Sequence, residues 1–192
     1  MKRILCYGDS NTRGSLGSGR RMEDAKQWPN VLQQLLGDEY RVVQEGLSGR
    51  VAGGFERQKP VYNGRRSFEV AYRSAAPVDL VIVALGTNDL KADYGRSAQN
   101  IADDLRWYAD AIQRFQDVAE GKDTKVLYIC PENHPQSQPG VWTELIRIMQ
   151  LFPEFVLDLG ELQKGPDGLH YSEAAHAQVA HNLKEMITEI QV

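Results

Sequence analysis

The stretch Arg3-Ile4-Leu5-Cys6-Tyr7, followed directly by Gly8-Asp9-Ser10-Asn11, decides how the rest of this sequence is interpreted. Its first part is a short, continuous apolar run, which is typical of a strand buried on both faces. Its second part breaks the run with glycine and polar residues, which is typical of a tight turn. Open α/β sheets bind ligands beyond the carboxyl ends of their strands. The stretch therefore indicates such a sheet, with functional residues where its strands end.

Four further apolar runs, rich in Val, Ile and Leu, have the character of buried strands: Arg41–Gln44, Leu80–Leu85, Lys125–Cys130 and Phe155–Leu157. Between them, apolar residues spaced three or four apart predict helices. We expect these helices to begin at Trp28-Pro29, to span 101–115 and 141–151, and to span 172–190 with Ser172 as N-cap. This alternation predicts a single domain, residues 1–192, with a flavodoxin-like three-layer α/β/α sandwich around a central parallel sheet of about five strands.

Composition excludes several classes of protein. The chain has 192 residues, is 42% hydrophobic and has a formal net charge of -4, so it is an ordinary globular sequence without the basic surface of a nucleic-acid-binding protein. No segment approaches the ~20 apolar residues of a membrane span. The apolar run near the N-terminus is shorter than the about 7–15 residues of a signal peptide. We expect a cytoplasmic protein with no nucleic-acid partner and no membrane span.

Neither a metal nor a cofactor is expected. Cys6 and Cys130 have no metal-binding spacing and are expected to be small buried hydrophobes. His176 and His181 are five residues apart, whereas a zinc-binding helix places its histidines four apart. A solvated or half-buried helix face is the expected environment of these two histidines.

The turn after the first strand contains a candidate nucleophile. Ser10 follows a buried strand directly, so its hydroxyl is presented at the edge of the sheet among free backbone N–H groups. A helix that starts after this turn would add its positive end, which favours a developing oxyanion. The alternative interpretation is that Asp9 and Ser10 are only turn or N-cap residues.

Two other strand ends deliver polar groups to the same edge. The third run ends in Gly86-Thr87-Asn88-Asp89, where the Asn88 side chain can donate an N–H to an anionic oxygen. An Asx turn or N-cap is the alternative for this segment. The second run enters Glu45-Gly46-Leu47-Ser48-Gly49-Arg50, where Gly49 can bring a bare backbone N–H close to a ligand.

The segment Asp167-Gly168-Leu169-His170 lies just before the final helix. An Asp and a His three residues apart around a turn can lie side by side, which leaves one ring nitrogen to face a nucleophile. A turn residue and a helix-entry cap are the alternatives. Taken together, the four segments supply a nucleophile, a base, a residue that orients the base and three oxyanion donors, which is the full set for acyl transfer.

These four blocks, in this order, resemble the SGNH (GDSL-type) hydrolase superfamily. The residues that carry the resemblance are Gly8-Asp9-Ser10-Asn11, Gly49, Gly86-Thr87-Asn88-Asp89 and Asp167-Gly168-Leu169-His170. The segments 2–7, 45–50 and 86–92 are similar to the bacterial arylesterase and acyltransferase branch. The resemblance implies Ser10 as the catalytic nucleophile, His170 as the base and Asp167 as the residue that orients it. It also implies an oxyanion hole made of the Ser10 N–H, the Gly49 N–H and the Asn88 side chain.

For the reaction, the resemblance implies a serine esterase that hydrolyses small carboxylic esters through an acyl-enzyme, with acyl transfer to alcohols, and a homo-oligomer. Asn11 stands where leucine is usual, and Arg13 stands where tryptophan is common. Arg13 places a cation near the acyl or leaving-group pocket. Candidate substrate-binding residues are Asp9, Asn11, Arg13 and His134, and the alternative for His134 is a plain surface loop.

Two alternatives to the small-ester esterase are open. One is a carbohydrate deacetylase or a lysophospholipase or thioesterase of the same superfamily. Long acyl chains need a continuous apolar groove, which no single stretch of this sequence supplies. The other is a non-catalytic flavodoxin-like binding module, which would require Ser10 and His170 to lie far apart or the base to be held away from the serine.

Overall fold

In a computed structural model, which describes residues 1–17, 19–55, 58–118 and 123–192, the five apolar runs form one parallel sheet. The strands are β1 (Lys2–Gly8), β2 (Tyr40–Gly46), β3 (Leu80–Ala84), β4 (Lys125–Ile129) and β5 (Phe155–Leu157). Their order across the sheet is β2-β1-β3-β4-β5, which is the flavodoxin-like order. The predicted fold class is confirmed.

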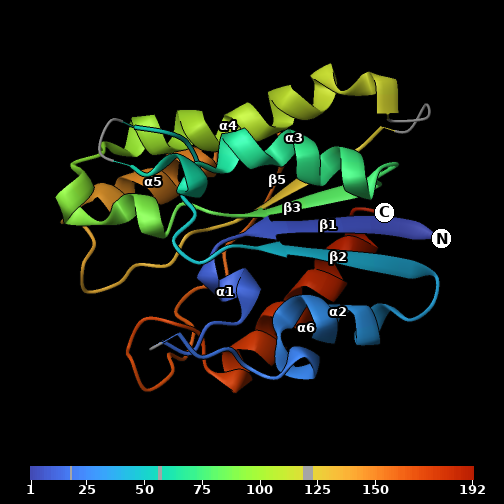
Figure 1. Cartoon of the computed structure of the whole chain (residues 1–192), viewed down its shortest axis with the longest axis horizontal. Helices are drawn as coiled ribbons and strands as arrows, with labels where there is room; N and C mark the ends of the chain where they lie inside the picture. The colour runs from blue at the N-terminus through green and yellow to red at the C-terminus, as the bar shows by residue number, and fades with distance from the viewer. Residues whose placement is uncertain (18, 56–57, 119–122) are drawn as a thin grey trace.

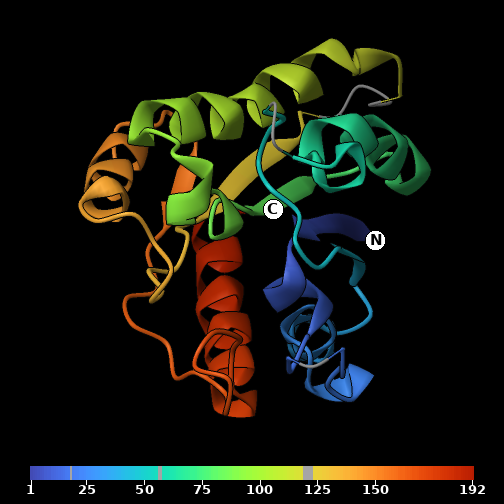
Figure 2. The same ribbon diagram turned by 60° about the vertical axis from the view of Figure 1, so that its left-hand side comes forward.

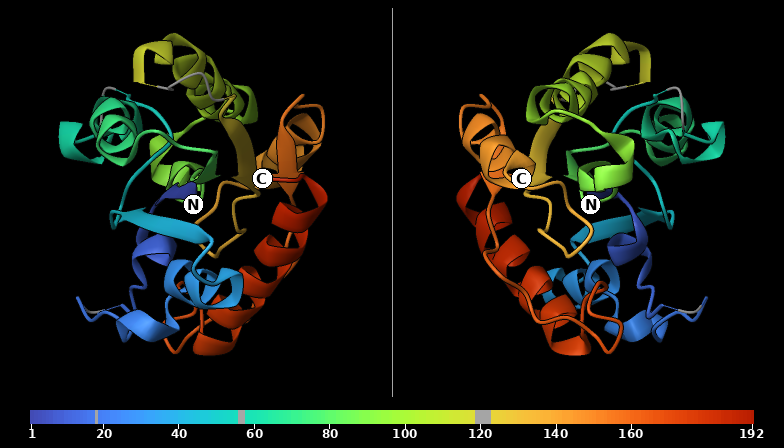
Figure 3. Two further views of the ribbon diagram at one scale, coloured as in Figure 1. Left: turned by 90° about the vertical axis from the view of Figure 1, so that its right-hand side faces the viewer. Right: turned by 90° about the vertical axis from the view of Figure 1, so that its left-hand side faces the viewer.

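Helices cover both faces of the sheet (Figure 1). One face carries α3 (Gly64–Ala75), α4 (Ala98–Arg114) and α5 (Val141–Met149), and the other carries α2 (Trp28–Leu36) and α6 (Glu173–Glu189). Figures 2 and 3 show the same layers from other directions. The short helix α1 (Ser10–Arg13) follows β1, and single 3-10 turns occupy Asp24–Lys26, Pro60–Tyr62, Asn88–Leu90, Ala92–Tyr94 and Gln116–Val118.

The alternating direction of side chains along the central strands explains why the protein has two hydrophobic cores, one on each face of the sheet. Successive side chains of a strand point to opposite faces, so a strand covered on both sides must be apolar at every position. Leu5 and Tyr7 of β1 belong to the core beneath α3, α4 and α5. Ile4 and Cys6 belong to the core beneath α2 and α6. Cys6 and Cys130 are both buried and free, as expected from the sequence.

Helix α3 is absent from the sequence prediction. Its buried residues Phe68, Ala71, Tyr72 and Ala75 follow the helical spacing of three and four. Charged residues such as Arg65, Arg66 and Arg73 dilute the apolar pattern, which explains why the helix was missed.

All strands run in one direction, so their carboxyl ends meet at one edge of the sheet, on the left in Figure 1. The segments that follow β1, β2, β3 and β4 therefore leave the sheet at the same edge. The C-terminus lies at the opposite edge, where the Tyr40 hydroxyl donates to the Val192 carbonyl at 3.2 Å. Within the residues described, no helix is long and apolar enough to cross a bilayer.

The central strand β3 should dominate stability. Ile82 is fully buried between β1 and β4, so Ile82→Ala should lower the free energy of unfolding by about 2–5 kcal/mol. Val70 on α3 is 69% exposed, so Val70→Ala should change the free energy of unfolding by less than about 0.5 kcal/mol. Urea denaturation followed by circular dichroism measures both. Equal effects of the two substitutions would contradict the assignment of β3 to the core.

Candidate active site

The turn after β1 exposes the predicted nucleophile. Asp9 caps α1 by accepting the backbone N–H of Asn11 at 2.9 Å. The helix expected beyond this turn is a single turn that begins at Ser10 itself and ends at Arg13. Among the residues that the structure describes, the half-buried Ser10 hydroxyl has no hydrogen-bond partner. The side chain is therefore available to a base or a ligand.

Asp167 and His170 lie side by side, as their spacing predicts. His170 Nδ1 is 2.6 Å from Asp167 Oδ2, and the backbone N–H groups of Leu169 and His170 both donate to Asp167 Oδ1 at 3.0 Å. Burial alone would raise the pKa of Asp167, but the hydrogen bonds from the His170 ring and from these backbone groups lower the pKa to about 2. The carboxylate is therefore ionised at neutral pH and fixes the imidazole by its Nδ1 edge.

The segment that carries His170 is tied to the turn that carries Ser10. Asn11, next to Ser10, accepts the backbone N–H of Tyr171, next to His170, at 3.0 Å. Gly17 lies directly against the Asp167 carboxylate, so the loop after α1 also contacts this segment. Both contacts hold the predicted nucleophile and the predicted base at the same edge of the sheet.

The predicted oxyanion donors lie on the segments after β2 and β3. Gly49 has a φ of +82°, a conformation that favours glycine. Asn88 donates one side-chain N–H to the Arg50 carbonyl at 3.1 Å, which leaves its second N–H free for a ligand. Asn88 therefore bonds to a distant segment and does not close a local Asx turn.

The Arg50 side chain bridges the ends of β1 and β2 by hydrogen bonds. Its Nη1 donates to the Gly8 carbonyl at 3.0 Å and to the Glu45 carbonyl at 2.5 Å. The guanidinium also lies 4.1 Å from the centre of the Tyr7 ring. Because Gly8 ends β1 and Glu45 lies near the end of β2, this one side chain links the two strand ends from which the turns begin.

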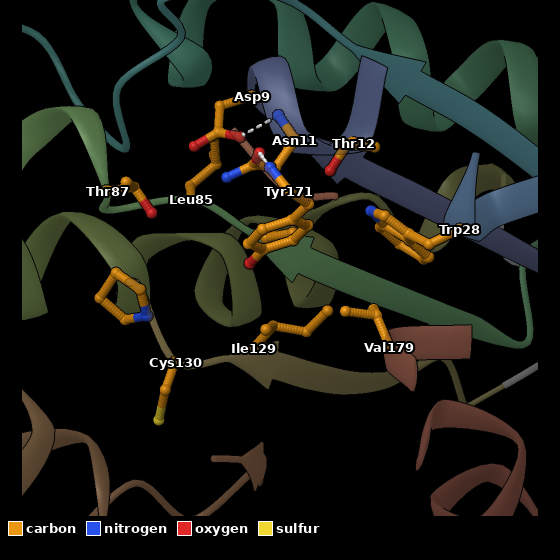
Figure 4. Close-up of a pocket in the computed structure, with 12 residues that line it drawn as sticks. Asp9, Asn11, Thr12, Trp28, Leu85, Thr87, Ile129, Cys130, Tyr171 and Val179 are labelled. Carbon is orange, nitrogen blue, oxygen red and sulfur yellow. Dashed lines mark hydrogen bonds between the residues drawn. The ribbon is translucent and has the colours of Figure 1, made fainter. Parts of the chain in front are cut away.

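A small cavity lies below the turn after β1 (Figure 4). Its volume of about 10 Å³ accommodates roughly one water molecule. The Tyr171 ring separates Asp9 and Asn11 from Ile129 and Val179 (Figure 4). Asp9 is 3% exposed, and this burial raises its pKa to about 6 against the opposing effects of the Asn11 N–H and of His170.

Two predicted substrate-binding residues have defined neighbours. Arg13 is partly exposed, and its Nη1 lies 3.4 Å from the Ser15 hydroxyl. His134 is buried, with Nε2 3.0 Å from the Thr87 carbonyl and Nδ1 accepting the Gln136 N–H. Burial lowers the pKa of His134. The surface-loop interpretation of His134 is wrong, and substrate contact stays a prediction for these residues.

The environment of His176 contradicts the prediction of a solvated or half-buried helix face. Its side chain is fully buried, where Nδ1 accepts the Trp28 backbone N–H at 3.1 Å, and burial lowers its pKa to about 4. The described residues contain no group of three or more His, Cys, Asp or Glu side chains that could hold a metal ion.

An ion pair that the sequence did not indicate lies beside the site. Lys164 Nζ is 2.5 Å from Glu132 Oε2, and it lies 5.1 Å from the centre of the Tyr171 ring. A cavity of about 390 Å³ next to this pair has a wall of mixed polar and apolar character, formed by Cys130, Pro131, Glu132, Asn133, Trp142, Asp158, Gly160, Glu161 and Lys164. Cys130 and Pro131 also line the small cavity, so the two cavities share a wall. Glu132 and Lys164 are far apart in sequence, so no local pattern could have paired them.

Residues 6–189 match the model of the GDSL-like lipase/acylhydrolase family. The chain belongs to this family. None of the curated proteins matches the sequence significantly.

Solved structures of GDSL-like hydrolases share the whole fold. A protein from Agrobacterium tumefaciens str. C58, described as an arylesterase, has a TM-score of 0.85 and 29% identity, over 99% of this chain and 100% of its own. The inhibitor-bound aryl esterase of M. smegmatis has a TM-score of 0.86 and 29% identity, over 98% and 99% of the two chains. The family and these structures identify the chain as an ester-hydrolysing serine hydrolase. Est24, a carbohydrate acetylesterase from Sinorhizobium meliloti, has a TM-score of 0.82 at 24% identity over 99% and 100% of the chains, which shows the fold alone.

Two glycines of one loop provide a matched test of the Asp167 position. Gly17 and Gly19 have φ values of +77° and +75°, so alanine strains the backbone equally at both. A methyl group at Gly17 would collide with the Asp167 carboxylate, whereas nothing lies near Gly19. Gly17→Ala should therefore lower esterase kcat at least about 10-fold, because the imidazole loses its orientation, while Gly19→Ala should keep it. Equal activities of the two variants would contradict a role for Asp167.

Asp9 should make stability depend on pH. Its pKa is raised to about 6 in the folded protein, so the ionised form is destabilised there, and stability is lost as the pH rises through about 4 to 6. Asp9→Asn keeps an acceptor for the Asn11 N–H and removes the charge. It should raise the free energy of unfolding by about 1–3 kcal/mol at pH 8 and leave it unchanged at pH 4.

Urea denaturation of wild type and variant at both pH values measures this difference. The exposed carboxyl of Asp38 supplies the control, because Asp38→Asn should give no pH-dependent gain. A gain for Asp9→Asn that is equal at pH 4 and pH 8 would refute the electrostatic cause.

Proposed function

We propose that this GDSL-like hydrolase cleaves small carboxylic esters, with Ser10 as nucleophile, His170 as general base and Asp167 as the residue that orients the base. The 2.6 Å contact between His170 and Asp167 carries the proposal. It occupies Nδ1 of the imidazole and leaves Nε2 free to accept the proton of Ser10. The bond from Tyr171 to Asn11, at 3.0 Å, supports a position of His170 beside the nucleophile turn and argues against a non-catalytic binding module.

The reaction proceeds through an acyl-enzyme. His170 Nε2 removes the Ser10 proton as Oγ attacks the ester carbonyl, and the resulting imidazolium is stabilised by the ionised Asp167. The imidazolium then gives its proton to the departing alcohol. Water, activated by the same His170, attacks the acyl-enzyme and releases the acid. An alcohol in place of water gives acyl transfer.

Three donors would stabilise the tetrahedral oxyanion: the Ser10 N–H, the Gly49 N–H and the second side-chain N–H of Asn88. Support comes from the positive φ of Gly49 and from the Asn88 bond to Arg50, which orients the amide. Such donors act most strongly when the fold positions them before the reaction begins.

The surroundings favour a small or hydrophilic substrate. The 390 Å³ cavity shares a wall with the small cavity below the Ser10 turn. Four charged side chains line it, those of Glu132, Asp158, Glu161 and Lys164, beside apolar residues that include the partly buried Trp142. These groups suit a hydroxyl-rich leaving group better than a long acyl chain. A carbohydrate acetyl ester is therefore the second candidate substrate, whereas a lysophospholipid or a long-chain thioester is disfavoured.

Further parts of this proposal rest on the sequence and on the resemblance to the arylesterase and acyltransferase branch. They are a single domain over residues 1–192, acyl transfer to alcohols, a homo-oligomeric state and a cytoplasmic location.

Hydrolysis of p-nitrophenyl esters from acetate to octanoate tests the proposal. Wild type should prefer short chains, Ser10→Ala and His170→Ala should lower kcat at least about 10³-fold, and Asn88→Ala should lower it about 10²–10³-fold. Ser74→Ala, at an exposed position of α3, serves as the matched serine control and should retain full activity. Equal activity of wild type and Ser10→Ala would remove Ser10 as nucleophile. A preference for octanoate would overturn the assignment of small esters.

A further inference from the structure

A network of buried charges lies behind the predicted oxyanion hole. The Asp89 side chain is fully buried, and its Oδ1 is 2.5 Å from Nη1 of Arg96, whose side chain is 8% exposed. Arg96 Nη2 is 2.5 Å from Asp104 Oδ2, and Asp104 also pairs with Arg65. Burying charges costs free energy that pairing only partly offsets, so such a network is weak evidence for a role in stability. Its position suggests another role.

The network holds the segment that follows β2, which we call the strap (residues 49–52). Asp89 Oδ2 accepts the Ala52 N–H at 2.9 Å. The preceding residue, Asn88, donates to the Arg50 carbonyl at 3.1 Å. Two consecutive residues after β3 therefore hold the strap at two points. On α4, the Tyr108 hydroxyl holds the same segment by donating to the Ala52 carbonyl at 2.7 Å.

These contacts determine where two of the oxyanion donors point. The Asn88 amide has two N–H bonds, and one is directed at the Arg50 carbonyl, so the direction of the other depends on where that carbonyl lies. The position of the Arg50 carbonyl depends in turn on the anchor at Ala52. Gly49 begins the same strap, so its N–H is subject to the same anchor.

We propose that Asp89, held in place by Arg96, is a positioning residue that fixes the Gly49 N–H and the Asn88 amide relative to each other for transition-state stabilisation. This inference rests on the proposed function. Asp89 itself bonds to the strap and to Arg96, and it acts on the substrate only through Asn88 and Gly49.

Two conservative substitutions disturb the network in different ways. Asp89→Asn keeps the size of the side chain but supplies one acceptor oxygen, so its amide N–H₂ faces either the Ala52 N–H or Arg96. Arg96→Lys keeps the positive charge but cannot bridge Asp89 and Asp104, because an ammonium is a single point and a guanidinium is a planar fork. Arg3→Lys is the matched control. Like Arg96, which also donates to the Asn100 carbonyl, Arg3 donates to backbone carbonyls. These are the carbonyls of Ala75 and Ala76, at the opposite end of β1 from the site.

The experiment measures kcat and KM for p-nitrophenyl acetate, the inhibition constant of a boronic acid that mimics the tetrahedral intermediate, and the pH profile of kcat/KM. Assays run well below each variant's unfolding temperature. Asp89→Asn and Arg96→Lys should each lower kcat by about 10- to 100-fold, with KM changed less than about 3-fold. Boronate affinity should fall by a similar factor, and the acid limb of the pH profile should stay in place because His170 is untouched. Arg3→Lys should match wild type.

A double-mutant cycle with Asn88→Ala separates positioning from general destabilisation. If Asp89 acts through the oxyanion donors, Asp89→Asn should cost less than about 3-fold in kcat when Asn88 is already alanine. The same full loss in both backgrounds, or a loss of kcat without a loss of boronate affinity, would overturn the inference. If Asp89→Asn does not fold, the cycle with Arg96→Lys decides by the same criteria. Absence of Ser10-dependent activity in wild type would instead overturn the proposed function.

Discussion

The hydrogen bond between the Asn11 side chain and the Tyr171 N–H joins residues 160 positions apart, and the arrangement of the site depends on it. The Ser10 turn and the segments that carry Gly49 and Asn88 follow neighbouring strands, so the parallel sheet places them together. The segment that carries His170 follows β5, which β3 and β4 separate from β1, so it needs its own attachment to the Ser10 turn. Asn11 provides it, which explains an asparagine at a buried position where the resembled pattern has leucine.

Asp9 and Asp167, two carboxylates of the candidate site, have opposite electrostatic environments. Asp167 is only partly buried and accepts several N–H groups, so its pKa falls to about 2 and it stays ionised whenever the protein is folded at ordinary pH. Asp9 is enclosed, and its burial raises its pKa to about 6 although it accepts one backbone N–H. The site thus combines a permanent anion beside the proposed base, His170, with a carboxyl group next to the proposed nucleophile, Ser10, whose ionised form the fold disfavours. This difference follows first from the deeper burial of Asp9 and then from the larger number of hydrogen-bond donors around Asp167.

The features of this fold that can be predicted from the sequence are those with a local physical signal. The strands are continuous apolar runs, and the contact of Asp167 with His170 arises within one turn, so both could be predicted. Burial of a single histidine is not a local property, so neither the fully buried position of His176 nor the burial of His134 could be predicted from neighbouring residues. Helix α3 escaped notice because its charges dilute a regular apolar spacing. The Arg96 network and the pair of Glu132 with Lys164 join distant segments, and only the fold brings them together.

The order in which the layers are completed has a consequence for synthesis on the ribosome. The apolar side chains of β1 and β3 on one face, such as Ile4 and Ile82, are covered by α2 and α6, and α6 is the last helix of the described chain. A nascent chain that lacks α6 therefore leaves part of this face open to water, as would a prematurely terminated product. Exposed apolar surface of this kind promotes aggregation and recruits chaperones.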